Sequence, residues 1–317
     1  MSGPVLVAGG AGLLGSAVCL ELARQGFRVL AADLLAEWGD GRAARLARLR
    51  SLAPAGVEFS RLDLTDAGAV RALLRNDPPD AVVNAALFPP DGPGLGPLLS
   101  SCVEGRVPFF LHVSDAALYR EAAEPGERAA EDEPLDPGDD PALVQRAREE
   151  EALHAASISF AILRVFPLLG PGFPPGRFPA DALEAILSGE EVVLASDEPA
   201  DFLHVEDAAR GVRLALSRRP PGRTLNLGSG LGVRPSEVLA ALAVRAGRPV
   251  RLRVEGPPGR KPRVADTVRA WDEIGFCSQR GIGDAVEAIA AARLGGRPLL
   301  GFPETGPARP AGGAARP

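Results

Sequence analysis

Several residue types that carry much of enzyme chemistry are scarce in this chain. Its 317 residues include one tyrosine, Tyr119, and the sequence shows a single lysine, Lys261. The two lie far apart in the chain, so they cannot form a motif of closely spaced residues.

The three cysteines, Cys19, Cys102 and Cys277, are odd in number and widely separated. This pattern favours reduced, mostly buried thiols over a disulfide framework or a zinc site.

The sequence also lacks an excess of positive charge and long apolar runs. The formal net charge is -6 and there is no long basic run, so nothing in the sequence supports binding to nucleic acid or to an anionic membrane. No apolar stretch approaches the ~18 residues of a membrane span, and none resembles a signal peptide. The histidines His112, His154 and His204 share no metal-ligand spacing, so no metal is expected. We therefore expect a cytoplasmic protein that acts on a small-molecule substrate.

The first forty residues contain the most informative pattern. Residues 5–8 form a short apolar run, which a glycine-rich segment at 9–15 follows. Leu14, Val18 and Leu22 then recur at the spacing of one helix face. The pattern predicts a strand, a tight glycine turn and an amphipathic helix.

A second predicted strand, residues 27–32, ends at Asp33, eighteen residues after Gly15. This spacing is close to that of a dinucleotide-binding strand–helix–strand unit. Glycines permit the tight turn and let the backbone approach a pyrophosphate, while the helix N-terminus faces the phosphate charge. Asp33 can accept hydrogen bonds from a ribose 2′-hydroxyl and would repel a 2′-phosphate, which favours NAD over NADP.

The spacing Gly-x-x-Gly-x-x-Gly at Gly9, Gly12 and Gly15 resembles the opening of the extended short-chain dehydrogenase/reductase superfamily, in its NAD-dependent epimerase/dehydratase branch. Further segments similar to this family follow in order, so that the resemblance covers most of the chain. They are residues 63–66, 80–86, 110–119, 131–137, 162–164, 202–207 and 225–230.

The resemblance implies an α/β fold, a doubly wound parallel-sheet Rossmann fold with a smaller C-terminal substrate-binding lobe. We expect residues 1–167 to form the NAD-binding domain, with 201–225 returning to it. The substrate-binding lobe is expected at 168–200 and 226–302. Residues 303–317, rich in Pro, Gly, Ala and Arg, are expected to be a disordered tail.

The resemblance also implies NAD as the cofactor, bound at the carboxyl ends of the strands. The glycine turn, the ends of the second and third strands, the small-residue turn after the fourth strand and the fifth strand would supply the contacts. The expected NAD-binding residues are Gly9, Gly10, Ala11, Gly12, Leu13, Leu14, Gly15, Asp33, Leu34, Asp63, Leu64, Ala85, Ala86, Leu87 and Val113.

The catalytic helix departs from the family pattern. Family enzymes use a Tyr-x-x-x-Lys pair, in which the lysine holds the nicotinamide ribose and lowers the pKa of the tyrosine. The corresponding helix is recognisable at residues 141–151 but contains neither residue, so the chain resembles an atypical member of the family. Counting from the preceding proline segment places the pair at Pro141 and Gln145, whereas counting back from the sixth strand places it at Ala142 and Arg146. Only the second alignment places a positively charged residue, Arg146, at the position of the lysine.

The family's third catalytic residue, a serine or threonine four positions before the tyrosine of the strand-five loop, is replaced by Asp115. Beside the nicotinamide, Asp115 could act as a general acid or base. Tyr119 would be the one phenol near the site. Asp115, Tyr119 and Arg146 are thus the candidate catalytic residues, and a turn-forming aspartate and a packed loop tyrosine are the alternatives for the first two.

Other substitutions bear on the substrate. Ala116 and Ala117 stand where the sugar-nucleotide dehydratases of the family carry Asp-Glu, so their elimination chemistry is not expected. Pro167 and Ala200 replace an asparagine and an arginine of the sugar-nucleotide enzymes, which removes a donor and a charge for a nucleotide diphosphate. The segment between the fourth and fifth strands is short and rich in Pro and Gly, so we expect this part of the pocket to be rebuilt.

The oligomeric state is left open. Family members often form dimers through the helix after the fourth strand and the catalytic helix. Here the first of these is shortened, and the second carries three glutamates, residues 149–151, which we interpret as a solvated helix face. A homodimer is one alternative and a monomer is the other.

Two functional hypotheses follow from these residues. The first is an atypical NAD(H)-binding enzyme with redox, epimerase-like or NAD-assisted chemistry on a small hydroxy or keto substrate, a sugar or a natural product, with Asp115 replacing the usual acid/base set. The second is a catalytically silent relative that keeps NAD binding for a regulatory or scaffold role. A minor third alternative is a non-redox isomerase or cyclase in a biosynthetic pathway.

Overall fold

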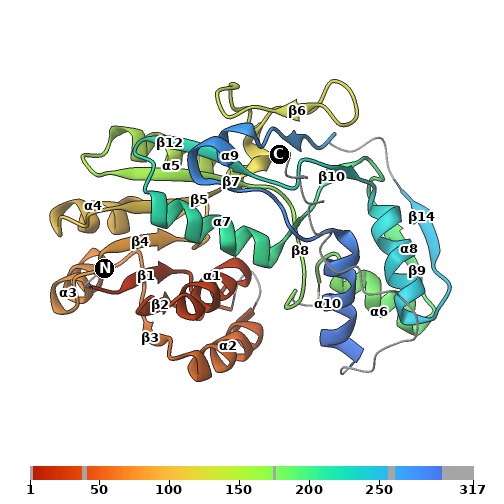
Figure 1. The fold of residues 1–317 in the computed structure, drawn as a ribbon, viewed down its shortest axis with the longest axis horizontal. Helices are drawn as coiled ribbons and strands as arrows, with labels where there is room; N and C mark the ends of the chain where they lie inside the picture. The colour runs from red at the N-terminus through yellow and green to blue at the C-terminus, as the bar shows by residue number, and fades with distance from the viewer. Residues whose placement is uncertain (1–2, 38–40, 174–175, 256–260, 295–317) are drawn as a thin grey trace, which may run out of the picture.

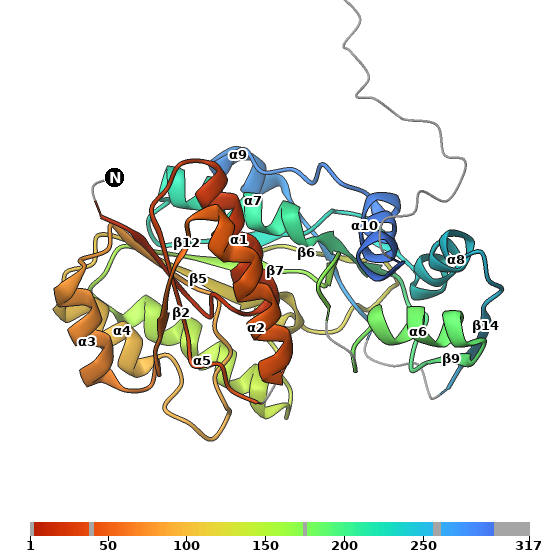
Figure 2. The ribbon, with the colours of Figure 1, turned by 90° about the horizontal axis from the view of Figure 1, so that it is seen from below.

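The computed structural model describes residues 3–37, 41–173, 176–255 and 261–294 (Figure 1). These residues form a larger domain built on a sheet and a smaller lobe of helices beside it (Figures 1 and 2). The expected disordered tail at 303–317 lies outside the described residues. None of the helices that the structure describes is long and apolar enough to cross a bilayer.

The larger domain contains a seven-stranded parallel sheet in the order β12-β7-β5-β4-β1-β2-β3. The order reverses between β1 and β4, and open α/β sheets bind ligands at such a reversal, outside the carboxyl ends of the strands. The strands are β1 (Val5–Ala8), β2 (Val29–Asp33), β3 (Glu58–Arg61), β4 (Ala81–Asn84), β5 (Phe110–Asp115), β7 (Phe160–Val165) and β12 (Arg223–Leu227).

Helices cover both faces of this sheet, which is why its inner strands are almost entirely buried and apolar. One face packs on α1 (Leu13–Arg24), α2 (Gly41–Leu52), α7 (Val205–Arg218) and α9 (Val268–Ile274). The other face packs on α3 (Ala67–Asn76), α4 (Gly96–Glu104) and α5 (Pro141–Ala155). The predicted doubly wound Rossmann architecture is confirmed.

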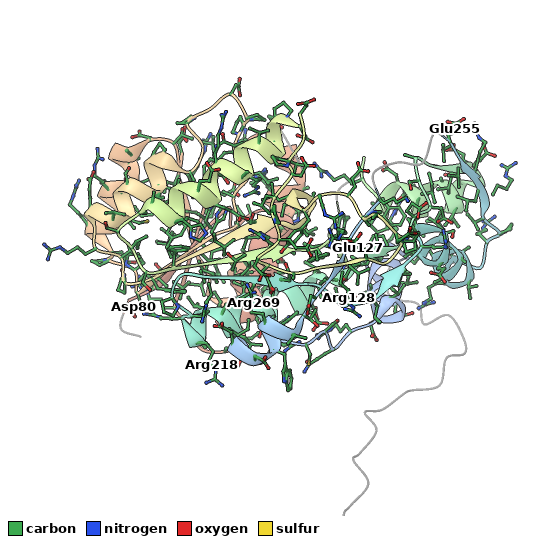
Figure 3. All side chains as sticks on the ribbon, turned by 90° about the horizontal axis from the view of Figure 1, so that it is seen from above. Asp80, Glu127, Arg128, Arg218, Glu255 and Arg269 are labelled. Atoms are coloured by element: carbon green, nitrogen blue, oxygen red, sulfur yellow. The ribbon has the colours of Figure 1, made fainter. Side chains whose placement is uncertain are left out.

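The smaller lobe has a hydrophobic core of its own, made by α6 (Ala180–Ser188), α8 (Pro235–Ala246), α10 (Ile282–Leu294) and the strand β9 (Glu191–Leu194), which pairs with β14 (Arg251–Val254). Figure 3 places Glu255 at the far end of this lobe, and Glu127 and Arg128 near its junction with the larger domain. Although α9 lies within the range 226–302, it packs against α7 and β12 of the larger domain.

Short elements join these parts. The 3-10 turns are η1 (Ala53–Ala55) and η2 (Ala116–Leu118). The two-residue strands pair as β8 (Leu168–Leu169) with β11 (Leu203–His204), β10 (Ala200–Asp201) with β13 (Gly232–Val233), and β6 (Arg128–Ala129) with β15 (Val264–Ala265).

The start of α5 follows from the local sequence. Asp140 precedes it, and its carboxylate accepts hydrogen bonds from the backbone N–H groups of Ala142 and Leu143, at 2.8 and 3.4 Å. Pro141 occupies the first helical position, where its missing N–H costs nothing. This cap sets the residue at which α5 begins.

The α5 glutamates do not form the solvated face that we predicted. Glu149 and Glu150 are 2% and 3% exposed, and Glu151 is the one that faces solvent. Glu150 forms a bidentate ion pair with Arg164 of β7, at 2.7 and 3.1 Å. It also accepts a hydrogen bond from the hydroxyl of Ser114 of β5. The interpretation of a solvated face was wrong because these buried partners compensate the charge.

We predict that Glu150→Gln lowers the free energy of unfolding by about 3–5 kcal/mol, because it leaves the buried Arg164 guanidinium uncompensated. Glu151→Gln, the exposed neighbour on the same helix, should change it by less than about 0.5 kcal/mol. Urea unfolding of both variants measures the difference. Equal, small effects would contradict a structural role for the Glu150–Arg164 pair.

Candidate active site

A cavity of about 730 Å³ opens at the carboxyl ends of β1, β2, β4, β5 and β7. It extends from Asp33 and Leu34, past the turn that follows β1, to Val113 and Asp115 on β5. This volume is in the range of small-molecule and cofactor sites. The cavity therefore lies where the reversed strand order predicts a ligand.

The turn after β1 approaches the turn after β4 more closely than any side chain would allow. Gly9 has a φ of +76°, and a Cβ there would lie 2.7 Å from the Cα of Ala86. A Cβ on Gly15 would lie 2.1 Å from the carbonyl oxygen of Gly9, so the start of α1 is locked against this turn. The first residues of α1, with the positive end of its dipole, thus form part of the cavity wall.

Most of the predicted cofactor residues line this cavity. Those that do are Gly9, Gly12, Leu13, Leu14, Asp33, Leu34, Asp63, Leu64, Ala85, Ala86, Leu87 and Val113. Gly10, Ala11 and Gly15 are not among the lining residues. Gly10 and Ala11 belong to the turn after β1 and Gly15 to the first turn of α1, and a Cβ on Gly10 or Gly15 would meet neighbouring atoms.

Asp33, at the end of β2, is buried and has a partner that the sequence did not reveal. The Nη1 of Arg45, from α2, lies 3.0 Å from its Oδ1 and 3.1 Å from its Oδ2. The backbone N–H groups of Leu35 and Ala11 also donate to its two oxygens, at 2.8 and 3.2 Å. Arg45 itself lines the cavity. No sequence pattern singles it out, because its place depends on how α2 packs.

Asp115 ends β5 and lines the cavity with an exposed carboxylate. Its Oδ1 accepts a hydrogen bond from the backbone N–H of Ala117, at 2.8 Å, and so caps the short turn that follows. Asp115 thus has both features that we considered as alternatives: it forms the turn, and it also faces the cavity. The backbone contact holds the carboxylate at the end of the strand.

Arg146 reaches the same cavity from α5. Its Nη1 donates to the carbonyl oxygen of Val113, at 3.2 Å, and to Oε2 of Glu149, at 3.3 Å. Gln145 instead donates to Glu149, and it is not among the cavity-lining residues. Of the two alignments of the catalytic helix, the one that includes Ala142 and Arg146 therefore puts a cation on the cavity wall.

A buried polar layer lies beneath this wall. The side chain of Asn84 accepts from the N–H of Ala86, at 3.3 Å, and its Nδ2 lies 3.0 Å from Nδ1 of His112. Burial and the nearby Arg146 hold the pKa of His112 well below its usual value, so its ring is neutral at pH 7. Its Nε2 lies 3.7 Å from Glu149, and burial raises the pKa of that carboxyl. The layer links the turn after β4 to Arg146.

Tyr119 is not brought together with Asp115 and Arg146. Its side chain is 1% exposed, and its hydroxyl donates to Oδ1 of Asn226, at 2.7 Å, and accepts from Nη1 of Arg164, at 3.0 Å. Burial raises its pKa to about 12. It does not line the cavity. We therefore revise the expectation of a catalytic Tyr119: its phenol is committed to a buried network, as the packed-tyrosine alternative predicted.

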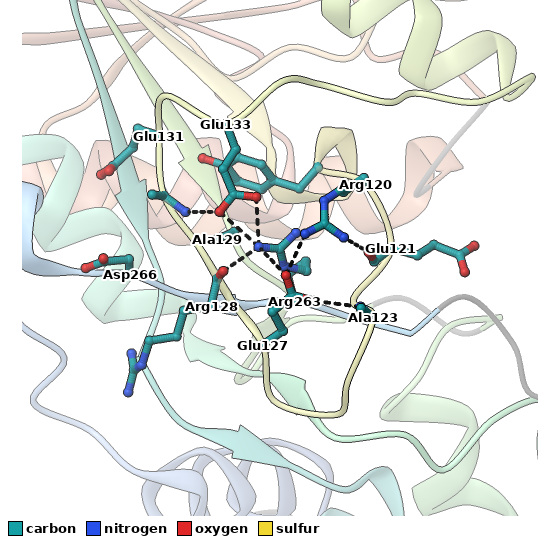
Figure 4. A network of polar contacts seen from close by, with 12 residues as sticks. Arg120, Glu121, Ala123, Glu127, Arg128, Ala129, Glu131, Glu133, Arg263 and Asp266 are labelled. Carbon is teal, nitrogen blue, oxygen red and sulfur yellow. Dashed lines mark hydrogen bonds and ion pairs between the residues drawn. The ribbon is translucent and has the colours of Figure 1, made fainter.

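The loop that follows Tyr119 is anchored to the C-terminal part of the chain (Figure 4). Arg263, beside β15, contacts both carboxylate oxygens of Glu133, at 2.8 and 2.9 Å, and lies 3.5 Å from Glu127. Lys261, the chain's one lysine, donates to the carbonyl oxygen of Ala123, at 3.1 Å. Neither Tyr119 nor Lys261 is among the residues that line the cavity.

The remaining cavity wall is largely apolar. Most of its side chains come from the segments after β4 and β7, and the others follow β2 and β3 or lie on β5 and β7, so no single sequence motif links them. The additional lining residues are Ala36, Leu62, Thr65, Phe88, Pro89, Asp91, Gly92, Pro93, Ser114, Val165, Phe166, Pro167, Leu168, Phe173 and Arg177. Within the part of the chain that the structure describes, no group of three metal-ligating side chains occurs.

We predict that Gly9→Ala destabilises the protein by several kcal/mol, because its Cβ would overlap the backbone of Ala86 in addition to the unfavourable φ. Gly26→Ala is the matched control: Gly26 has a φ of +80°, but open space surrounds it. The control should cost only about 1–2 kcal/mol, since it carries the backbone strain alone. Urea unfolding measures both, and equal losses would contradict the close approach of the two turns.

Comparison with known proteins agrees with this architecture. The model of the NAD dependent epimerase/dehydratase family matches residues 5–93 and 94–228. UDP-glucose 4-epimerase uge1 of Schizosaccharomyces pombe is 26% identical, over 88% of this chain and 91% of its own. The UDP-glucose 4-epimerase of Bacillus subtilis is 26% identical, over 88% and 93%. The crystal structure of the UDP-glucose 4-epimerase of Thermus thermophilus in complex with NAD superposes with a TM-score of 0.79, at 27% identity, over 92% and 99%.

Proposed function

Because the chain belongs to the NAD dependent epimerase/dehydratase family, we propose that its cavity binds NAD and that the protein is an atypical, epimerase-like enzyme. Its substrate is a small hydroxy or keto compound. The observation that carries the proposal is that one cavity contains the glycine turn, the Asp115 carboxylate and the Arg146 guanidinium. Similarity to UDP-glucose 4-epimerases over most of their length supports epimerase-like chemistry.

The residues present fit a dinucleotide. The close approach at Gly9 leaves the turn without a side chain where a pyrophosphate would meet backbone N–H groups. Asp33 lies at the end of β2, where a ribose is bound in Rossmann domains. Asp63 and Leu64 supply the adjoining wall for an adenine, and Val113 lies on the nicotinamide side. The Thermus thermophilus relative, at 27% identity, is described in complex with NAD, which supports NAD as the dinucleotide.

Asp115 supplies the acid–base group of the proposed reaction. When bound, NAD supplies a reversible hydride acceptor for a substrate carbon. The Asp115 carboxylate then takes the proton of the substrate hydroxyl as a carbonyl forms, and returns it when the carbonyl is reduced. The Ala117 N–H keeps the carboxylate at the end of β5 while this happens. No phenol is needed in this scheme, which agrees with the buried position of Tyr119.

Arg146 takes over the positive charge of the missing lysine. Its contacts with Val113 and Glu149 use Nη1, and they fix the guanidinium on the cavity wall. From there it can donate to ribose hydroxyls of the dinucleotide, as the family's lysine does.

The cavity favours a substrate different from a sugar nucleotide. Pro167, which has no donor group, lies on the wall where the family's sugar-nucleotide enzymes have an asparagine. Phe88, Leu168 and Phe173 make this region apolar, and Arg177 adds one exposed cation. We therefore assign the substrate to small hydroxy or keto compounds with a substantial apolar part.

A second candidate function is NAD binding without catalysis. It is favoured by one observation: the only tyrosine of the chain is buried in a hydrogen-bond network outside the cavity. In that case Asp115 has only its turn-capping role. The two candidates agree on cofactor binding and differ in turnover.

The catalytic assignment is tested with Asp115→Asn. A panel of alcohols, UDP-glucose included, is incubated with the protein and NAD. Net oxidation is followed as NADH absorbance, and epimerisation, which returns the hydride to the substrate, is followed by proton NMR of the substrate. A substrate found in either way is used for kinetics. We expect kcat/KM to fall at least about 100-fold in Asp115→Asn, the usual contribution of a general acid or base. NADH affinity should stay within about threefold, because the carboxylate is replaced by an amide of equal size. Asp139→Asn, an exposed carboxylate before α5, is the control.

Two outcomes would contradict parts of this account. NADH binding by the wild type without turnover of any compound in the panel would favour the silent relative. Unchanged kinetics in Asp115→Asn would remove Asp115 as the acid–base group while leaving the cofactor assignment intact.

The cofactor role of Arg146 is tested with Arg146→Met. We expect NADH to bind at least about tenfold more weakly, since a charge-assisted hydrogen bond contributes about 1.5–3 kcal/mol. Arg148→Met, an exposed arginine on the same helix, should bind NADH as the wild type does. Titration of NADH fluorescence measures both affinities. A normal affinity in Arg146→Met would show that the guanidinium does not replace the missing lysine.

A further inference from the structure

The Asp33 carboxylate is saturated by its neighbours in the protein. A carboxylate has about four sites at which it accepts hydrogen bonds. Oδ1 accepts from the N–H of Leu35 and from Arg45, at 2.8 and 3.0 Å. Oδ2 accepts from the N–H of Ala11 and from Arg45, at 3.2 and 3.1 Å. A ribose hydroxyl that binds Asp33 must therefore share or displace one of these donors.

The charge of Asp33 is also compensated. An isolated acid at this position repels the 2′-phosphate of NADP, which is the reason for expecting NAD. Arg45, from α2, offsets that charge, and both side chains are almost fully buried, with 10% and 2% of their areas exposed. Arg61 stands directly opposite Asp33 in the β2–β3 register, and its Nε lies 3.4 Å from the carbonyl oxygen of Leu34. Two arginines thus flank one acid at the end of β2.

Arg45 is positioned to serve either cofactor. It lines the cavity together with Asp33 and Leu34, so its side chain borders the same part of the cavity as the acid. Arginine binds phosphate through paired, charge-assisted hydrogen bonds. The N–H groups of Arg45 can therefore donate to the oxygens of a 2′-phosphate. A 2′-hydroxyl can instead donate to the carboxylate of Asp33.

We propose that Arg45 is a specificity-determining residue, and that its pairing with Asp33 lets the site bind the 2′-phosphorylated dinucleotide NADP(H) as well as NAD(H). This inference rests on the proposed function, because it assumes that the cavity holds a dinucleotide. It goes beyond that function by extending the cofactor class and by assigning a role to a residue of α2.

The experiment compares the dissociation constants of NADH and NADPH by fluorescence titration, at one fixed and low ionic strength. For the wild type we expect the two constants to agree within about tenfold. In Arg45→Leu, NADPH binding should weaken at least about tenfold relative to NADH binding, because the acid is then left without its compensating charge. Arg50→Leu, an exposed arginine of the same helix, should leave the ratio unchanged.

A structural ion pair would behave differently. If Arg45 only stabilised the buried Asp33, then Arg45→Leu would weaken both cofactors equally and lower the melting temperature, and this result would overturn the proposal. Arg45→Gln, which keeps donors but removes the charge, provides a second variant should Arg45→Leu fail to fold. It should show the same change in the NADPH-to-NADH ratio.

Measurements on the wild type alone distinguish failure of this inference from failure of the proposed function. NADH binding with NADPH more than about 100-fold weaker would overturn the inference and leave the proposed function intact. No binding of either dinucleotide would overturn the proposed function itself, and the inference with it.

Discussion

The close approach of two backbone turns is the constraint on which the rest of this structure depends. Gly9, after β1, lies against the backbone of Ala86, after β4. A Cβ on Gly9 would clash with that backbone. This contact brings the start of α1 to the point where the strand order reverses. The helix N-terminus, the end of β2 and the end of β5 therefore open into one cavity. Without it the candidate cofactor and catalytic residues would not share a surface.

Charged groups that lie inside the domain hold this cavity in shape. Glu149 fixes Arg146 on the wall, and Glu150 pairs with Arg164 beneath β5 and β7. Burying such carboxylates is costly unless each has a partner, and the partners here come from α5 itself and from strands of the sheet. Arg164 also donates to the hydroxyl of Tyr119, so the one phenol of the chain belongs to this buried network. The function that we propose therefore assigns acid–base chemistry at the cavity to Asp115.

The sequence was sufficient for the features that depend on local patterns. The strand, glycine turn and helix at the N-terminus, Asp33 at the end of β2 and the beginning of α5 at Pro141 all follow from spacing and capping. Arg45, Glu149 and Glu150 could not be predicted, because their roles depend on which helix face meets the sheet. The burial of Tyr119 depends on a loop held by Arg263, a contact between distant parts of the chain.

The most direct test of the account is a crystal structure of the protein with NAD at saturating concentration. The account predicts the pyrophosphate at the turn that contains Gly9, and a carboxylate oxygen of Asp115 within ~4 Å of the nicotinamide C4 or of a substrate hydroxyl beside it. A cavity without dinucleotide would contradict the account, and so would a nicotinamide ring placed away from Asp115.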